Sequence, residues 1–248
     1  MLEVELTTQG QIAVITLQDL KPKNINDSVF GGQIEDACRT IKENDDVVVV
    51  VVTSLMDGFL SVESRTLRLV NFRELATMTN LIANMKKPTI AAIESGAHAE
   101  GLELVLSCDI RVASRRSFFS LPQVLRGFMP SAGGTQRLPR IVGIGRALEL
   151  MLTGRVFGSD EALMMGVIQY QQESTAMCKA LELAEIIGTY GTVAARYLKE
   201  AVRDGIDMTL AQGLVLESDL SILLHSTEDR MEGINSFVER RSPRYKGQ

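Results

Sequence analysis

The sequence predicts an α/β protein with a largely parallel β-sheet that is covered by helices on both faces and followed by a helical C-terminal region. Over the first 140 or so of its 248 residues, short apolar segments alternate with helical segments, which is typical of such a sheet. The run "VVVVVV" at residues 47–52 lacks the alternation of a half-exposed strand and indicates a fully buried one. After about residue 143 every segment has helical spacing and is closed by or near a glycine.

The elements follow from local patterns. "EVELTT" and "IAVITLQ" alternate like two strands and are joined by a turn at Gly10, so they predict a hairpin. Asp27 or Ser28 is a plausible helix cap for the segment that follows. The further predicted order is helix 28–43, strand 47–53, loop 55–64, helix 66–85, strand 88–95, helix Gly101–Ser107, strand 108–114, a short extended segment 118–124, and helices to the C-terminus. We expect a core over residues 1–190 and a C-terminal helical region over residues 191–248.

Composition narrows the possible classes of protein. A net charge of −5 disfavours nucleic acid or an anionic membrane as a partner. The longest apolar run is too short to span a bilayer, and the N-terminus lacks the features of a signal peptide. Three widely spaced cysteines without a CxxC pair indicate reduced thiols and a cytoplasmic location. With only two histidines we expect no metal site.

The absence of two glycine-rich motifs argues against two common ligand sites, and a third glycine-containing segment allows two interpretations. No GxGxxG follows the first strand and no GxxxxGK[ST] is present, so dinucleotide-binding and P-loop sites are unsupported. "PSAGGTQRLPRIVG" at residues 130–143 is a tight turn that opens a helix. It is either an anion cradle or a structural turn, and on physical grounds we favour the structural turn.

The stretch "GAHAEGLELVLSCD" at residues 96–109 carries two carboxylates one helical turn apart in an apolar setting, Glu100 and Glu103. Buried carboxylates are costly, so they are usually paired, neutral or functional. Glu100, at the start of the predicted helix, either points outward and interacts with the helix dipole or points inward. In the second case several carboxylates share one cleft, and their repulsion leaves a neutral acid beside an ionised base.

Several segments in sequence order together resemble the enoyl-CoA hydratase/isomerase, or crotonase, family: "KPTIAAIESGAHAEGLELVLSCDIRVAS", "AGGTQRL", "TGRVFGSDEALMMGVI" and "STEDRMEGINSFVERRSPRYKG". The resemblance covers nearly the whole chain. It implies a spiral core of ββα turns and a C-terminal helical region that forms homotrimers or hexamers. It also implies an acyl-CoA thioester as substrate, with coenzyme A as part of that substrate and no permanently bound cofactor.

The resemblance also assigns roles to residues. Two backbone N–H groups would stabilise an enolate-like oxyanion, and the matching positions are Ser61 and Glu100. Glu103 matches the first of the two glutamates that hydratases of the family use, the one that activates water. Gln123 stands where the second is expected, and an amide has no proton to exchange near neutral pH.

The loop around Ser61 departs from the family pattern, because Glu63 replaces a small residue beside the thioester. Our preferred hypothesis is an acid/base pair of Glu103 and Glu63, and the alternative for Glu63 is a surface or ion-paired glutamate. The predicted substrate-binding residues, apart from Glu103, are Ser61, Val62, Glu63, Ser64, Glu100 and Gln123.

The expected function is hydration of an enoyl-CoA, or its reverse. The alternatives are another reaction of the family (decarboxylation, C–C hydrolysis or isomerisation) and an acyl-CoA-binding homologue without catalysis. His98 is expected to be a structural histidine rather than a substrate contact, and His225 a packing residue. Apolar side chains suggest an acyl pocket, namely Leu60, Leu121, Leu125, Phe128 and Met129.

Overall fold

The computed structural model describes residues 2–19, 28–56, 58–59 and 72–248. Its main sheet has the strand order β1-β2-β3-β4-β6-β9. These strands are β1 (Leu2–Gln9), β2 (Ile12–Asp19), β3 (Val49–Ser54), β4 (Thr89–Ile93), β6 (Ile110–Ser114) and β9 (Tyr170–Gln172). From β2 to β9 every neighbouring pair is parallel, and only the β1–β2 hairpin is antiparallel. The predicted parallel sheet and the N-terminal hairpin are therefore confirmed.

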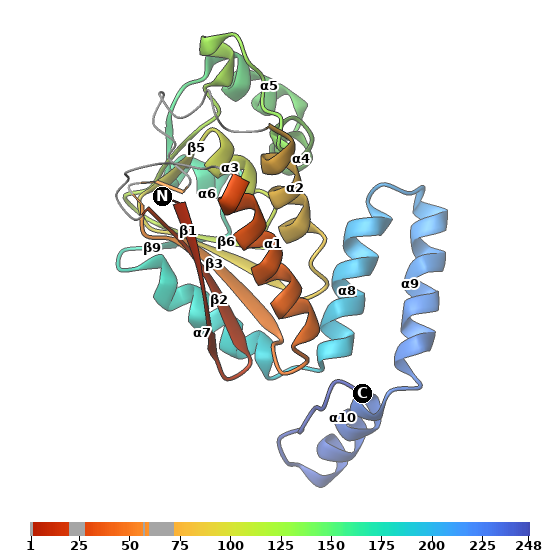
Figure 1. Ribbon diagram of the computed structural model, residues 1–248. Coiled ribbons are helices and arrows are strands. Elements are labelled where there is room, and N and C mark those ends of the chain that lie inside the picture. Colours follow the sequence, from red (N-terminus) through yellow and green to blue (C-terminus); the bar gives the residue numbers. More distant parts are fainter. Residues whose placement is uncertain (1, 20–27, 57, 60–71) are drawn as a thin grey trace.

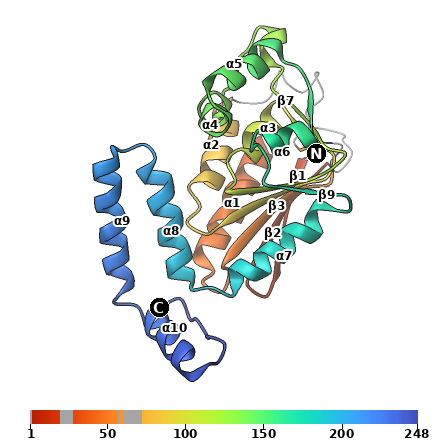
Figure 2. The same ribbon diagram turned by 180° about the vertical axis from the view of Figure 1, so that it is seen from behind.

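Both faces of this sheet are covered, which explains the run of valines. Successive side chains of a strand point to opposite faces, so Val50 and Val52 enter one apolar core and Val49 and Val51 enter the other. Helix α7 (Ala176–Gly188) covers the second face, and its buried alanines allow it to lie close to the strands. Helices α1 (Ser28–Glu43) and α2 (Phe72–Ala83) lie on the first face (Figures 1 and 2).

A second, smaller sheet creates the ββα repeat. It contains β5 (Gly96–His98), β7 (Phe118–Ser120) and β8 (Phe157–Gly158). The chain passes from β4 to β5 and then into helix α3 (Glu100–Val105), and later from β6 to β7 and then into the 3-10 helix η1 (Gln123–Arg126). Phe59, after β3, forms a parallel bridge with Ala97 of β5. This stacking brings the segments that follow β3, β4 and β6 to the same end of the molecule.

The remaining helices complete the core and extend from it. They are α4 (Gly134–Val142), α5 (Ile144–Thr153), α6 (Ser159–Met164), α8 (Thr192–Gly205), α9 (Leu210–Leu224) and α10 (Glu228–Glu239). Asp109 holds α8 against the core through Lys199 (2.6 Å) and Arg203 (2.8 Å). Helix α9 begins with a capping box between Thr209 and Gln212. Helix α9 lies on the far side of α8 from the sheets, and α10 lies beyond the end of the α8–α9 hairpin (Figure 1).

Some predicted boundaries need correction. The segment predicted as extended at residues 118–124 is β7 followed by the first two residues of η1, because Gln123 begins a turn after Pro122. The helix predicted as Gly101–Ser107 runs over Glu100–Val105. The predicted helix 66–85 is α2 within the described residues, and its first six residues lie outside them. The division at residue 190 stays a prediction; it falls between α7 and α8.

No helix among the described residues has both the length and the apolar character needed to cross a membrane.

Candidate active site

The site is centred on Glu103, a carboxylate with no solvent exposure in the middle of helix α3. All six residues of α3 are buried, because the helix lies between β5, α2 and α4. Such a position is unfavourable for an ionised group unless donors compensate for the lost water. The question is therefore which groups face its two oxygens.

One oxygen of Glu103 is held by the turn that opens α4. Its Oε1 accepts hydrogen bonds from the backbone N–H groups of Ala132 (2.7 Å) and Gly134 (2.8 Å). Charge-assisted bonds of this kind are shorter and stronger than neutral ones. The "AGG" turn is thus an anion cradle as well as a structural turn, and its anion is the protein's own carboxylate. The preference for a purely structural turn was wrong.

Both glycines of this turn lie very close to neighbouring side chains, which leaves little room for a Cβ atom. Gly133 has φ +106°, and a Cβ on it would lie 2.0 Å from Nη1 of Arg137. A Cβ on Gly134 would lie 3.1 Å from both Cγ and Oε1 of Glu103 and 3.0 Å from Cβ of Pro130. A side chain at Gly133 would be strained by the positive φ and would displace Arg137, whereas one at Gly134 would press directly on Glu103.

The charge state of Glu103 results from opposed effects. Burial raises the pKa of its carboxyl above the ordinary value, and the negative charge of Glu100 raises it further. Hydrogen bonds from the backbone of Gly134, Ala132 and Ser131 lower that pKa and favour the ionised form. The resulting pKa is raised, as suits a group that exchanges protons closer to neutral pH.

Gln123 faces the other oxygen of Glu103. It is buried at the start of η1, and its Nε2 lies 3.4 Å from Oε2 of Glu103. Its Oε1 is buried and accepts no hydrogen bond from the described residues. Native structures rarely leave such an atom unsatisfied unless water or a ligand completes the site. The fold therefore brings together Glu103 and Gln123, as the sequence predicts.

Glu100 is buried, with 6% of its surface exposed, so of the two alternatives the structure excludes the outward, solvent-exposed one. As the first residue of α3, its backbone N–H has no intrahelical acceptor, and no acceptor for it occurs among the described residues. Ala99, which precedes it, has φ 50° and ψ −120°. A non-glycine residue in that conformation costs on the order of 1–3 kcal/mol, and such strain is concentrated at functional sites.

Four predicted residues, Ser61, Val62, Glu63 and Ser64, lie outside the described residues, as does Leu60. Phe59, which precedes them, is buried and donates its N–H to the carbonyl of Gly96 (2.7 Å). The described part of this loop therefore ends beside Gly96 of β5, which lies four residues before the first residue of α3, Glu100.

The histidines and the predicted apolar pocket differ in outcome. His98 is half-buried and its Nδ1 lies 2.9 Å from Oγ of Ser120, joining β5 to β7, and burial lowers its pKa. This supports a structural histidine. His225 is exposed in the single chain and its Nδ1 lies 2.7 Å from the carbonyl oxygen of Ser221, so its packing role stays a prediction. Of the apolar residues, Leu121 is buried, whereas Leu125, Phe128 and Met129 are more than half exposed.

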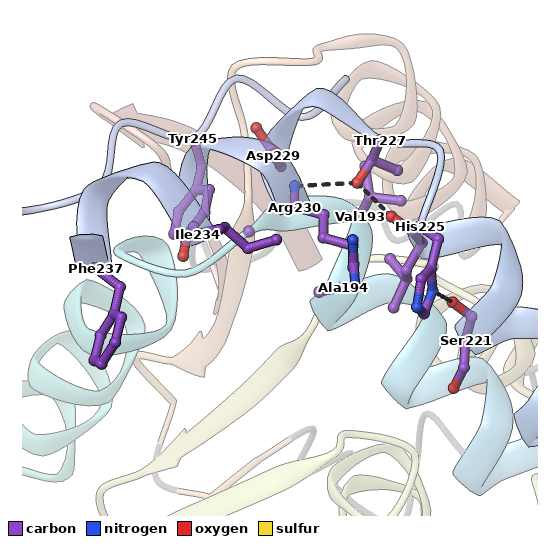
Figure 3. Close-up of a pocket in the computed structure, with 13 residues that line it drawn as sticks. Val193, Ala194, Ser221, His225, Thr227, Asp229, Arg230, Ile234, Phe237 and Tyr245 are labelled. Atoms are coloured by element: carbon purple, nitrogen blue, oxygen red, sulfur yellow. Dashed lines mark hydrogen bonds between the residues drawn. The ribbon is translucent and has the colours of Figure 1, made fainter. Parts of the chain in front are cut away.

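A cavity of about 740 Å³ lies elsewhere, between α8, α9 and α10 (Figure 3). His225, Ile234, Phe237 and Tyr245 line it, and none of the predicted site residues that the structure describes does. In the described part of the chain, no group of three or more His, Cys, Asp or Glu side chains could hold a metal ion.

The residues that hold Glu103 from outside its own helix were not predicted from the sequence; they are Ala132, Gly134 and, behind them, Thr79 and Arg137. The only available signal was the glycine pair in "AGGTQRL". Backbone donors leave no other trace in residue identity.

The chain is an α/β protein with two sheets and a buried glutamate held by backbone N–H groups. Comparison with known proteins identifies its family. The family model for enoyl-CoA hydratase/isomerase matches residues 7–248, and the chain belongs to this family. It is 32% identical over 248 residues to a short-chain-enoyl-CoA hydratase of Clostridium acetobutylicum, covering 96% of this chain and 95% of that protein.

The crystal structure of an enoyl-CoA hydratase from Bacillus anthracis superposes with a TM-score of 0.90 at 30% identity, covering 99% of this chain and all of that one. The crotonase fold is confirmed. The methylglutaconyl-CoA hydratase of mouse is 42% identical over 180 residues, or 71% of this chain. That match spans 57% of the mouse protein's length, little more than half.

Proposed function

We propose that the chain catalyses the addition of water to a 2-enoyl or dienoyl CoA thioester, or the reverse reaction. The proposal rests on one observation: the two carboxylate oxygens of Glu103 differ in their hydrogen bonds. Oε1 accepts hydrogen bonds from two backbone N–H groups, whereas among the described residues Oε2 faces only the amide of Gln123, at 3.4 Å. Oε2 is thus the atom available to take a proton.

In the hydration direction, Oε2 of Glu103 removes a proton from water while the water oxygen bonds to Cβ of the thioester. The electron pair of the C=C bond moves to the carbonyl oxygen. The N–H groups of Glu100 and Ser61 stabilise the resulting enolate, each by about 3 kcal/mol. Protonation at Cα completes the addition, and the proton taken up by Glu103 returns to solvent.

The proton for Cα is assigned to Glu63, in its neutral form, because Gln123 occupies the position of the usual second glutamate, and Glu63 then regains a proton from solvent. Gln123 keeps a smaller role: its Oε1, which lacks a partner among the described residues, accepts a hydrogen bond from the attacking water. Water held between Gln123 and Glu103 is oriented for attack.

The same chain is proposed to assemble into a homotrimer or a hexamer. Helix α9 is mostly apolar and has no single apolar face, although it includes Glu217 and Asp219; it is exposed in the single chain, with Leu210 80% and Ile222 66% exposed. A helix of that composition is normally buried, and other copies of the chain would cover it. Sedimentation equilibrium tests this: a stable monomer at micromolar concentration would contradict it. The cytoplasmic location stays a prediction.

One alternative has an observation in its favour. With Gln123 in place of an acid, and a further buried carboxylate, Glu100, beside the developing negative charge, the chain would bind an acyl-CoA without turning it over. The other reactions of the family use the same enolate and are distinguished by product.

The test is the rate of crotonyl-CoA hydration by the wild type and three variants. We expect the wild type to be active, Glu103→Gln to lose about 100-fold or more, and Glu63→Gln to lose a similar factor. Full activity of Glu63→Gln beside an inactive Glu103→Gln removes Glu63 from the mechanism. Binding without turnover in the wild type, with activity gained by Gln123→Glu, would favour the non-catalytic alternative.

A further inference from the structure

We propose that Thr79 and Arg137 are positioning residues for Glu103: they hold the peptide between Ala132 and Gly133 so that the cradle's N–H groups point at the carboxylate. This inference rests on the proposed function, because it takes Glu103 as the base. Neither residue touches Glu103 through a hydrogen bond in the described structure. They act on the turn from behind it.

The carbonyl of Ala132 is the point of attachment. It accepts hydrogen bonds from Oγ1 of Thr79 (2.8 Å) and from Nη1 of Arg137 (2.8 Å). The peptide that carries this carbonyl lies between the peptide that carries the Ala132 N–H and the peptide that carries the Gly134 N–H. Both of those N–H groups donate to Glu103. Fixing the central peptide therefore fixes both donors.

The two positioning residues come from different helices and brace the turn from two sides. Thr79, on α2, is 2% exposed and buried beside Ala132. Arg137, on α4, lies over Gly133 so closely that a Cβ there would be 2.0 Å from its Nη1. Its Nη2 donates to Oδ1 of Asn80 on α2 (3.0 Å). The arginine thus links α2 to α4 across the turn.

The consequence for chemistry is a shift in the charge state of the base. Burial raises the pKa of Glu103, and the N–H groups of the cradle lower it. The other described charges that act on this carboxylate are Glu100 on its own helix and Arg137 on α4. A turn that is free to move presents weaker donors, so the pKa of Glu103 rises and a larger fraction of the base is protonated at a given pH.

The decisive variant is Thr79→Val, which removes the hydroxyl, keeps the shape and changes no charge. The matched control is Thr53→Val on β3, because Thr53 is also buried and its Oγ1 donates to an alanine carbonyl, that of Ala92 (3.0 Å). Thr79→Ser keeps the bond and should restore the wild-type behaviour. If Thr79→Val does not fold, Arg137→Lys keeps the charge but cannot reach Ala132 and Asn80 together.

Two readouts separate this inference from the proposed function. The first is the acid limb of the rate against pH; the second is the titration of Glu103 by ¹³C NMR in glutamate-labelled protein, assigned with Glu103→Gln, which needs no activity. We expect both to move up by about half a pH unit or more in Thr79→Val, and neither to move in Thr53→Val. An unchanged titration in Thr79→Val overturns the inference, whether or not the wild type hydrates crotonyl-CoA.

Discussion

Substitution of Gly134 by alanine tests the cradle with a single methyl group. The new Cβ would lie 3.1 Å from Cγ and Oε1 of Glu103 and 3.0 Å from Cβ of Pro130. Contacts this short are rare, so Glu103 or the turn must move by a few tenths of an ångström. Overpacking of a buried site costs about 1–3 kcal/mol.

Part of that cost is offset, since replacing glycine by alanine at a compatible position stabilises by about 0.4–1 kcal/mol through the unfolded state. Gly145 on α5 isolates this gain, because a Cβ there meets nothing within 4 Å. We therefore expect Gly134→Ala to be about 2 kcal/mol less stable than Gly145→Ala.

Activity should fall together with stability. A base misplaced by 1 Å can cost about 100-fold, so a smaller displacement of Glu103 should reduce kcat by about tenfold. Urea unfolding at equilibrium and steady-state hydration of crotonyl-CoA measure the two effects. If Gly134→Ala matches Gly145→Ala in stability and the wild type in rate, the cradle does not constrain Glu103 as described.

Two further predictions concern charge. The pKa of Glu103 is raised in the folded chain, so between the ordinary carboxyl pKa and the raised one the folded state binds the proton more tightly, and stability falls as pH rises through that window. Glu103→Gln should remove this dependence of stability on pH and raise the stability at neutral pH by about 0.5–2 kcal/mol. Thermal unfolding measured across pH tests this, and an unchanged pH dependence in the variant would contradict the prediction. Asp109→Asn should leave Lys199 and Arg203 without their carboxylate and cost about 2–3 kcal/mol, less than a fully buried pair. Hydrogen exchange in α8 should then become faster than in α7, and uniform exchange would count against Asp109 as the anchor of α8.

The sheet could be predicted from the sequence because burial on both faces leaves a direct trace in composition. The run at 47–52 is apolar at every position, and each of its residues enters one of the two cores. Glu103 differs, because Glu100 stands in the same apolar stretch. The apolar setting marks both carboxylates as unusual, and only the resemblance to the family assigns the role to Glu103.

The cradle could not be predicted in the same way, because its donors are backbone N–H groups that every residue except proline possesses. The bonds that brace it join Thr79 and Arg137 to Ala132, and the sequence places Thr79 53 residues before that alanine. Only the packing of α2 against the turn brings them together. The burial of Glu100 was also undecided, because a helix N-terminus favours a carboxylate whether it is exposed or buried.

The strained residue Ala99 left no signal for a related reason. A positive φ normally indicates glycine, and this chain has alanine at that position. Ala99 lies between β5, a strand of the second sheet, and the first residue of α3. Because alanine does not favour a positive φ, its presence at position 99 gives no indication of this conformation in the sequence.

The central claim is that Glu103 directs water onto an enoyl thioester. The most direct measurement is to incubate the protein with crotonyl-CoA in D₂O and to record the mass of the thioester, with Glu103→Gln in parallel. A product heavier by one D₂O with the wild type, and none with the variant, is the result expected. An unchanged thioester mass with the wild type, or equal product with Glu103→Gln, would contradict it.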